Sequence, residues 1–342
     1  MIEKVSIRNF RNHQQLDINI EKPFVYIHGP NGSGKTSILE SIYFCATTKS
    51  HRTSEETDMV KRGEPFLQVK LKTDQNRYEI VMSKKGKRAS INHVEKRRLS
   101  DYIGHLNVVM FAPEDLELIK GSPQTRRQFM DLEWMQLHKP YIRLLTTYRN
   151  ILKQRNSLLK KIKIEDDYTF LDILGEQLFE TGLDIMNERK TMIERLNKRM
   201  KDVYSLFTQH SIDLVYEPDV TEEAFKKHLK KHQKTDIMNQ TTSAGPHRDD
   251  FSFIFNGHDA KHYASQGEQR LIVIALKLSL LKLIEEITTK PACLLLDDVL
   301  SELDPIKQAL FLNQLPKGQQ IIMNSAIPIT GDHLQIIDMK KE

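Results

Sequence analysis

The chain has 342 residues, of which 39% are hydrophobic and 28% are charged. That length allows two domains or one large head with an insertion, and the composition is typical of a folded protein with much solvated helix. A formal net charge of +5 is too small to indicate nucleic-acid binding unless the basic residues are clustered.

The two cysteines and the first residues exclude several classes of protein. Cys45 and Cys293 both lie in apolar runs, so we expect buried reduced thiols rather than a disulfide or a zinc site. The initial stretch MIEKVSIRNFRNH has no apolar signal core. No stretch approaches the ~18 uninterrupted apolar residues of a membrane span. The expectation is a cytoplasmic protein.

Residues 1–120 are predicted to form a small α/β lobe. VSIRNF and PFVYIHG are typical strands, and the second leads into a glycine-rich loop that is followed by the helical stretch SILESIYFCA. FLQVKLKT and RYEIVMS carry apolar residues at every second position, as half-buried strands require. A turn over residues 84–87 then leads into RASINH. We therefore expect an antiparallel meander beside the glycine loop.

Residues 121–240 are predicted to form a helical arm. Leu144, Ile151 and Leu158 are spaced by seven residues, which indicates a helix packed against a partner helix. The segment KIKIEDDYTF interrupts this pattern, and a second amphipathic stretch follows it. The residues expected on the buried side of that stretch are Leu171, Leu174, Leu178, Ile185, Met192, Leu196 and Val203.

Residues 241–342 return to an α/β pattern. Asn256-Gly257 in FSFIFNGHDA is a strong signal for a two-residue hairpin turn. LIVIALKLSLLKLIEEI predicts a mostly buried helix, and ACLLLDD and QQIIMNS predict inner strands. The expected fold class is therefore α/β, with a mixed sheet flanked by helices and an antiparallel meander. The arm is inserted between the two halves of this head.

The stretch GPNGSGKT matches the pattern of a phosphate-binding loop. Its glycines allow a tight turn whose N–H groups point at phosphate oxygens, and the helix that follows adds the positive end of its dipole. Lys35 would neutralise the β- and γ-phosphates of ATP, and the Thr36 hydroxyl would hold Mg²⁺. The nucleotide contacts expected from this loop are Gly29, Pro30, Asn31, Gly32, Ser33, Gly34, Lys35, Thr36 and Ser37.

The stretch LLLDDVLSELD supplies a late acidic element. Asp297, at the end of an apolar strand, could reach the magnesium ion, and Asp298 is placed to orient or deprotonate the attacking water. A carboxylate pair at a strand end can instead be merely solvated or cap the next turn. The phosphate loop favours the catalytic interpretation, with Lys35 and Asp298 as the catalytic residues.

SQGEQR is the motif that discriminates between uses of the nucleotide. Ser265 and Glu268 have capping-box spacing, and a capped helix start with a glycine offers free N–H groups to an anion. One subunit's phosphate loop covers only one side of a nucleotide, so this motif would meet the γ-phosphate held by a second subunit. In this arrangement the chain resembles the ABC-type ATPase superfamily.

Within that superfamily the chain resembles the RecF family of bacterial repair ATPases. The resemblance lies in IRNFRNHQQLDI, GPNGSGKTSILESIYF, KSHRT, FAPEDLELIKGSPQTRRQFMD, AGPHRDDF, SQGEQR and LLLDDVLSELD, in this order. It implies that Ser265, Gln266 and Gly267 contact the nucleotide of a partner subunit, and that the loop 301–304 couples the two sites. Arg52 would reach phosphate or remain solvated. Whether Arg248 pairs structurally or acts in function stays open.

Two positions depart from the pattern of related ATPases. The switch position, usually histidine in transporter ATPases, offers Asn324 or Ser325, with Ser325 the hydroxyl that RecF proteins tend to have. Where relatives carry a metal-bridging glutamine, FAPEDLE offers Glu114 or Asp115. Both departures indicate slow hydrolysis, with ATP binding as a dimer-closing switch.

Basic residues cluster in the predicted hairpin, after it, at the bend of the arm and in its last helix. The clusters are Lys84, Lys85, Lys87, Arg88; Lys96, Arg97, Arg98; Lys160, Lys161, Lys163; and Lys226, Lys227, Lys230, Lys231. Such runs are commonly solvated faces. The resemblance implies that some contact DNA phosphates without reading bases, with steep salt dependence.

The leading hypothesis is a RecF-like, weakly DNA-stimulated ATPase. The resemblance implies that it dimerises on ATP, binds junctions of single-stranded and duplex DNA, and helps RecO and RecR to load RecA. A DNA-binding scaffold with negligible hydrolysis is one alternative. The ATPase subunit of a membrane transporter is another, but it would usually show an LSGGQ-type signature and a switch histidine.

Overall fold

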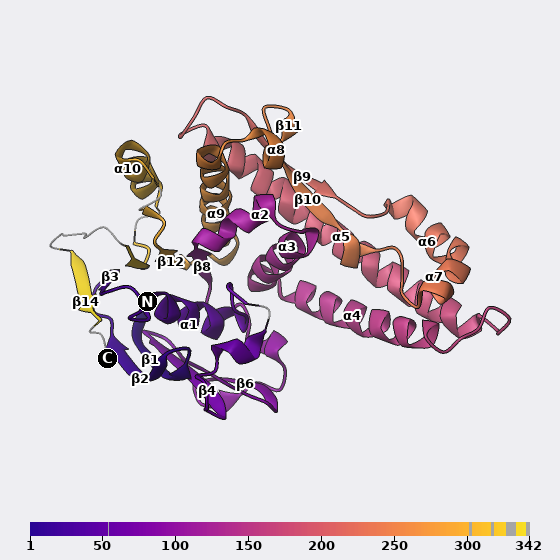
Figure 1. Cartoon of the computed structure of the whole chain (residues 1–342), viewed down its shortest axis with the longest axis horizontal. Helices are drawn as coiled ribbons and strands as arrows, with labels where there is room; N and C mark the ends of the chain where they lie inside the picture. Colours follow the sequence, from indigo (N-terminus) through magenta and orange to yellow (C-terminus); the bar gives the residue numbers. More distant parts are fainter. Residues whose placement is uncertain (54, 301–302, 316–317, 326–332, 340–342) are drawn as a thin grey trace. The chain divides into compact units, whose positions relative to one another are not determined.

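The computed structural model describes residues 1–53, 55–300, 303–315, 318–325 and 333–339 (Figure 1). The chain divides into two compact units, which are described separately below. Unit 1 contains Met1–Leu116, Val203–Thr208 and Arg270–Glu342, and unit 2 contains Glu117–Asp202 and Gln209–Gln269.

A five-stranded parallel sheet forms the centre of unit 1. Its strands, in spatial order, are β14 (Leu334–Asp338), β3 (Phe24–His28), β13 (Ile321–Asn324), β12 (Cys293–Asp297) and β8 (Val108–Phe111). All of β8, β12 and β13 is buried, which explains their unbroken apolar sequences. Because Ile27, Asn324 and Asp297 are register partners, three strands end side by side at one edge.

A six-stranded antiparallel sheet forms the second layer of unit 1 and confirms the predicted meander. Its strands, in spatial order, are β2 (His13–Asn19), β1 (Ile2–Phe10), β4 (Phe66–Thr73), β5 (Arg77–Ser83), β6 (Gly86–Ile91) and β7 (Val94–Glu95). Leu67, Val69 and Leu71 face the core, whereas the residues between them face outward. The alternation of apolar and polar residues in the sequence therefore correctly predicts which side chains face the core.

Helix α1 (Lys35–Thr47) lies between these two sheets and contacts strands of both. Every residue from Ser37 to Thr47 is buried. Helices α9 (Gln266–Thr288) and α10 (Pro305–Gln314) follow later in the chain. The expected α/β head is thus confirmed, with parallel and antiparallel pairings in separate sheets.

Unit 2 is mainly helical and confirms the predicted arm. Its main helices are α3 (Pro123–Leu137), α4 (Lys139–Leu159), α5 (Thr169–Tyr204, up to Asp202), α6 (Glu222–Lys231) and α7 (Gln233–Asn239), with the short α2 (Glu117–Lys120) and α8 (Ala260–Tyr263). The seven residues predicted for the buried side of α5 are all buried. A small sheet in the order β11 (His258–Asp259), β10 (Asp250–Phe255) and β9 (Ile212–Glu217) completes the unit.

The turn between β10 and β11 is the one predicted from Asn256-Gly257. Both residues have positive φ, 48° and 83°, as the two central positions of a type I′ turn require. The sequence-based division assigns residues 241–342 to the head, whereas the structure groups those up to Gln269 with the helical unit. The division into residues 1–120, 121–240 and 241–342 stays a prediction.

Both cysteines are buried free thiols, as predicted. Burial raises the pKa of Cys45 and of Cys293 to about 12, so neither is a reactive thiolate near neutral pH. In the parts of the chain that the structure describes, no helix is long and apolar enough to cross a membrane.

A buried ionic network fixes the GPHRDD stretch inside unit 2. Arg189 of α5 is only 3% exposed and binds Asp131 and Asp249, each at 3.0 Å. Asp249 also accepts hydrogen bonds from the Tyr216 hydroxyl and, at 3.0 Å, from the backbone N–H of Asp219. One fully buried carboxylate therefore joins α5 to β9 and to the segment that precedes α6.

Candidate nucleotide site

The phosphate loop joins β3 to α1 in unit 1, as the sequence predicts. Gly29, Gly32 and Gly34 all have positive φ, between 83° and 154°. At Gly34 a Cβ atom would lie 2.2 Å from Nε2 of His13, so only glycine fits there. The loop therefore packs so closely against His13 of β2 that any side chain at position 34 would force the backbone to move.

Lys35 begins α1, and its ammonium group holds the loop closed. Its Nζ donates to the carbonyl oxygens of Gly29 at 2.7 Å and of Pro30 at 3.0 Å. The first N–H groups of α1 have no partner within the helix and point into the loop, where the dipole is positive. The geometry is that of an anion site built from backbone N–H groups and one lysine.

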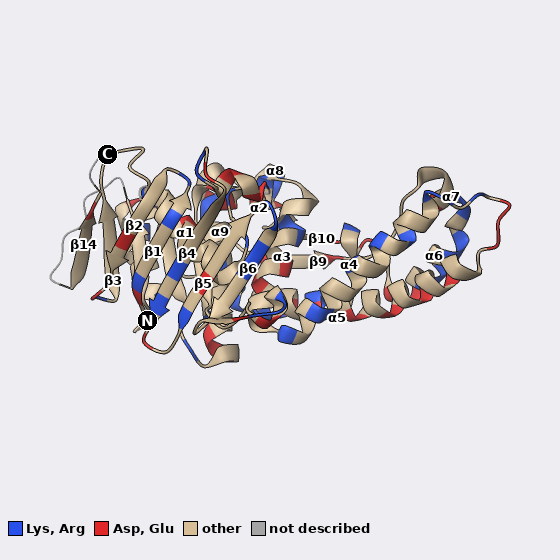
Figure 2. Cartoon of the chain, turned by 90° about the horizontal axis from the view of Figure 1, so that it is seen from below, with Lys and Arg blue, Asp and Glu red and all other residues tan. Residues whose placement is uncertain are grey.

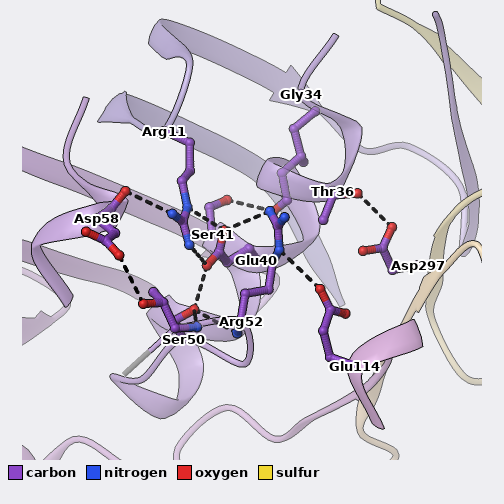
Figure 3. A network of polar contacts seen from close by, with 12 residues as sticks. Arg11, Gly34, Thr36, Glu40, Ser41, Ser50, Arg52, Asp58, Glu114 and Asp297 are labelled. Carbon is purple, nitrogen blue, oxygen red and sulfur yellow. Dashed lines mark hydrogen bonds and ion pairs between the residues drawn. The ribbon is translucent and has the colours of Figure 1, made fainter. Parts of the chain in front are cut away.

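Asp297 and Thr36 meet at the edge where β12 and β13 end (Figure 3). The Thr36 hydroxyl donates to Asp297 Oδ1 at 2.9 Å, and the Asn324 amide donates to the same oxygen at 2.6 Å. Burial raises the pKa of Asp297, although these two hydrogen bonds partly counter it. A carboxylate and a hydroxyl are hard oxygen donors, which suits Mg²⁺.

Asn324, one of the two alternatives at the switch position, contacts both aspartates. Its side-chain oxygen accepts a hydrogen bond from the Asp298 N–H at 2.8 Å, while its amide binds Asp297. Asp298 has φ of 52°, so this bond holds a left-handed residue in place. Asn324 thus positions both aspartates, and Ser325 lines the cavity beside it.

Arg52 lies between two carboxylates at the side of the loop (Figure 3). Its Nε is 3.4 Å from Oε1 of Glu114, and its guanidinium is 3.8 Å from the buried Glu40. Arg11 binds Glu40 through two hydrogen bonds of 2.6 and 2.8 Å. Arg52 lines the same cavity as the phosphate loop, and its contact with phosphate stays a prediction.

The partners of Asp115 are structural, which distinguishes this residue from Glu114. It accepts a hydrogen bond from the Ala112 N–H at 2.9 Å and pairs with the buried Lys277, also at 2.9 Å. Glu114 is 43% exposed and pairs with Arg52. Of the two candidates in FAPEDLE, Glu114 contacts Arg52, which lines the same cavity as the phosphate loop.

A cavity of about 1080 Å³ is lined by the phosphate loop, Arg52, Asp297, Asp298 and Asn324, and it is large enough for a nucleoside triphosphate. Four cations lie around it: Arg11, Lys35, Arg52 and Arg62. Sequence reasoning missed Arg11, Asn12, His28, Asp58 and Arg62, which also line it. FRNH, a turn of charged and amide residues between two predicted strands, is the signal that could have found the first two.

The SQGEQR motif lies at the start of α9 and forms the predicted capping box, with residues up to Gln269 in unit 2 and Arg270 in unit 1. Glu268 accepts a 2.6 Å hydrogen bond from the Ser265 N–H, and Ser265 Oγ accepts a longer one of 3.4 Å from the Glu268 N–H. Ser265, Gln266 and Gly267 are all exposed. Gln269 is buried and donates to the carbonyl of Ala264 at 3.1 Å, which fixes the turn before the helix.

Two further expectations have mixed outcomes. Ser301 and Glu302 of the proposed coupling loop lie outside the described residues, whereas Asp304 caps α10 through the Lys307 N–H at 2.9 Å. Arg248 is 51% exposed and 3.7 Å from Asp219, a surface ion pair. This favours pairing as its structural role, and the stability effect of such a pair is small.

Replacing Glu40 by glutamine tests the ion pair beneath the loop. Burial alone would raise the Glu40 pKa, but hydrogen bonds from Arg11 and Ser50 and the charge of Arg11 lower it below 4.5. The ionised pair therefore contributes stability above pH 4.5 and loses it as the pH falls through the lowered pKa. We expect Glu40→Gln to reduce neutral-pH stability by about 1.5–3 kcal/mol.

Urea unfolding at a series of pH values measures this effect. As the pH is lowered from neutral, the stability of the variant should also decline less steeply than that of wild type, because one titrating carboxyl is gone. Equal slopes for the two proteins on the acid side would show that Glu40 is not ionised in a stabilising pair.

Comparisons with known proteins agree with this geometry. A family model described as an AAA domain matches residues 4–289. The DNA replication and repair protein RecF of Acholeplasma laidlawii is 55% identical, over 97% of this chain and 95% of that protein. RecF of Streptococcus pneumoniae strain CGSP14 is 40% identical, over 98% and 94%.

Solved structures give the same result. A structure of the recombination mediator protein RecF-ATP in the RecFOR pathway superposes with a TM-score of 0.90 at 31% identity, covering 97% of this chain and 94% of that one. An Smc head bound to the C-terminal winged-helix domain of ScpA has a TM-score of 0.53 at 16% identity, which shows the fold alone. The chain belongs to the RecF family of DNA replication and repair proteins, and the transporter alternative is set aside.

Proposed function

We propose that this chain binds ATP with Mg²⁺ at the loop from Gly29 to Thr36. The observation that carries the proposal is the meeting of Thr36 and Asp297 beside the start of α1, in a cavity of triphosphate size. The solved relative at 31% identity holds ATP by its description. Lys35, which already bridges two loop carbonyls, is within reach of the β- and γ-phosphates.

The residues present suit a magnesium–triphosphate. Thr36 and Asp297 would hold the metal ion, the first directly and the second directly or through water. When bound, magnesium neutralises charge on the phosphate oxygens. Asp298 would orient the attacking water or accept its proton, and Asn324 keeps its backbone in position.

Hydrolysis by this site is proposed to be weak and stimulated by DNA. Asn324 and Ser325 are the alternatives at the switch position, and neither is a histidine. The Asn324 amide is occupied by Asp297, so it offers little to the γ-phosphate. Single-turnover hydrolysis on gapped DNA separates this proposal from the scaffold alternative. Phosphate release above that of an Asp298→Asn variant supports an ATPase, and release equal to that background supports the scaffold.

ATP is further proposed to join two copies of the chain on DNA. Ser265, Gln266 and Gly267 are exposed at a helix start, where the Ser265 hydroxyl and the N–H groups of Gln266 and Gly267 could meet the γ-phosphate of a second subunit. By family membership the closed dimer would act in the bacterial cytoplasm at junctions of single-stranded and duplex DNA. With RecR and RecO it would help to load RecA during recombinational repair.

A Ser265→Arg variant tests the dimer without touching the phosphate loop. The longer cationic side chain would block the approach of a second subunit, so we expect ATP-driven association to be lost while ATP binding is retained. Light scattering with ATP and DNA measures the mass, and fluorescence of an ATP analogue measures binding. A wild-type protein that stays monomeric with ATP and DNA would refute the clamp.

A further inference from the structure

The structure separates the basic residues of the β5–β6 region into two kinds. Lys87 is 10% exposed, donates to the Thr48 carbonyl at 2.8 Å and pairs with Glu56 at 2.6 Å. Burial lowers its pKa even though Glu56 counters the effect. The run of basic residues predicts Lys87, together with its neighbours, as a possible DNA contact. For Lys87 this prediction is wrong, because its side chain is buried.

The other six cations of this region lie along one edge of the six-stranded sheet, which we name the basic edge. They are Lys84, Lys85, Arg88, Lys96, Arg97 and Arg98. Five of them are exposed and Lys96 is half-buried. Figure 2 shows basic residues on β6 and on neighbouring strands of the sheet.

Strand register shows why residues that are apart in the sequence share this edge. Lys84 and Lys85 form the turn between Ser83 and Gly86, and Arg88 is two residues further along β6. The chain turns back at Asn92-His93, and β7 then runs antiparallel to β6, so that the Lys96 N–H donates to the Ala89 carbonyl at 2.8 Å. Arg97 and Arg98 therefore follow on from a position beside β6.

The described residues of this edge differ in their ion pairing from those on the outer face of the same sheet. Within the described residues, none of its six cations forms an ion pair with a carboxylate. On the outer face of the same sheet, by contrast, Lys4, Lys70 and Lys72 are each paired with an acid, at 2.8 to 3.5 Å. The acid within the stretch from Lys84 to Arg98 is Glu95.

Protection of an edge strand explains the presence of charge there but not its single sign. Charges of either sign discourage the addition of another strand, so a mixture of lysine and glutamate would serve equally well. Six unpaired cations of one sign repel one another in the free protein. Such a set is stabilised by a polyanion, and arginine adds the planar fork that matches phosphate.

We propose that the basic edge binds the sugar–phosphate backbone of DNA without reading its sequence. The proposal rests on the DNA-binding function proposed above and places part of it on a defined surface. Duplex DNA carries one charge per about 1.7 Å of its axis, so an edge of about 15 Å faces several phosphates. Lysine and arginine are typical phosphate contacts, which favours contact with the backbone of DNA over contact with its bases.

The test replaces Lys84, Lys85 and Arg88 by glutamine in the full chain. The probe is a fluorescein-labelled duplex with a single-stranded gap, and its anisotropy is followed with ATP between about 50 and 200 mM salt. Because each phosphate contact contributes about 0.9 to the slope of log affinity against log salt, we expect the slope to become shallower by about 2 to 3.

A matched control removes the same charge nearby by replacing Lys4, Lys70 and Lys72 with glutamine. These lysines are already paired with carboxylates, so we expect a change in slope of less than about 1. A second comparison replaces Lys227, Lys230 and Lys231 on α6. An equal loss in the first control would mean that total charge matters rather than this edge, and would overturn the proposal.

The outcomes also separate this proposal from the broader one. The triple variant should bind the ATP analogue and unfold thermally like wild type, because its three side chains make no ion pairs among the described residues. If wild type binds DNA and the variant keeps the same slope, the basic edge is rejected while the proposed function stands. If wild type binds ATP but no DNA, both DNA assignments fail.

Discussion

Replacing Lys35 by alanine is expected to lower the affinity for ATP–Mg²⁺ by about 10- to 150-fold. A hydrogen bond to a charged group contributes about 1.5–3 kcal/mol, and Lys35 is the cation at the start of α1. Its loss also frees the carbonyls of Gly29 and Pro30, which would then turn toward the phosphates. Titration calorimetry with a slowly hydrolysed ATP analogue measures the change.

Lys4→Ala is the control for this experiment. Lys4 lies on the outer face of the antiparallel sheet and pairs with Asp17 at 3.0 Å, so its removal changes the same net charge away from the loop. We expect its affinity for the nucleotide to match that of wild type. Comparable losses in both variants would indicate long-range electrostatics rather than contact with phosphate.

Replacing Asp249 by asparagine is expected to destabilise the protein by about 3–5 kcal/mol. Removing one partner of a buried ion pair leaves the other charge uncompensated, which is the most costly change in such a network. Arg189 would keep Asp131 but lose Asp249, and the Tyr216 hydroxyl would lose its acceptor. Urea unfolding followed by circular dichroism measures the loss.

The neighbouring residue provides the comparison. Asp250 binds Arg126 through two hydrogen bonds of 2.6 and 2.7 Å but is partly exposed, and Arg126 also donates to the Gly121 carbonyl. We expect Asp250→Asn to cost about 1 kcal/mol, because solvent can replace what is lost. Should the two variants lose equal stability, burial would not be what distinguishes these aspartates.

Features governed by local spacing could be predicted from the sequence. The phosphate loop, the capping box of Ser265 and Glu268 and the turn at Asn256-Gly257 each depend on residues within eight positions of one another. The geometry of each of these features is fixed by its own neighbouring residues. The parallel core strands were predictable for a related reason, because they are buried on both faces and read as unbroken apolar runs.

The features that were missed depend on pairing between distant segments. Asn324 positions Asp298 only because β13 lies beside β12 in one register, and the sequence left Asn324 and Ser325 as alternatives. Arg11 reaches Glu40 across 29 positions of the sequence. Lys87 is different, since it shares the inner face of β6 with Ala89 and Ile91, and that alternation could have revealed its burial.

The place of β3 within its sheet has a consequence for synthesis of the chain. Its neighbours on either side are β13 and β14, which lie in the last 22 residues of the 342, Ile321 to Glu342. The ribosome therefore makes the phosphate loop long before it supplies either of the strands that flank β3. Until then both edges of β3 are unpaired. A nascent chain released early would contain the phosphate-loop sequence without the neighbouring strands that support it.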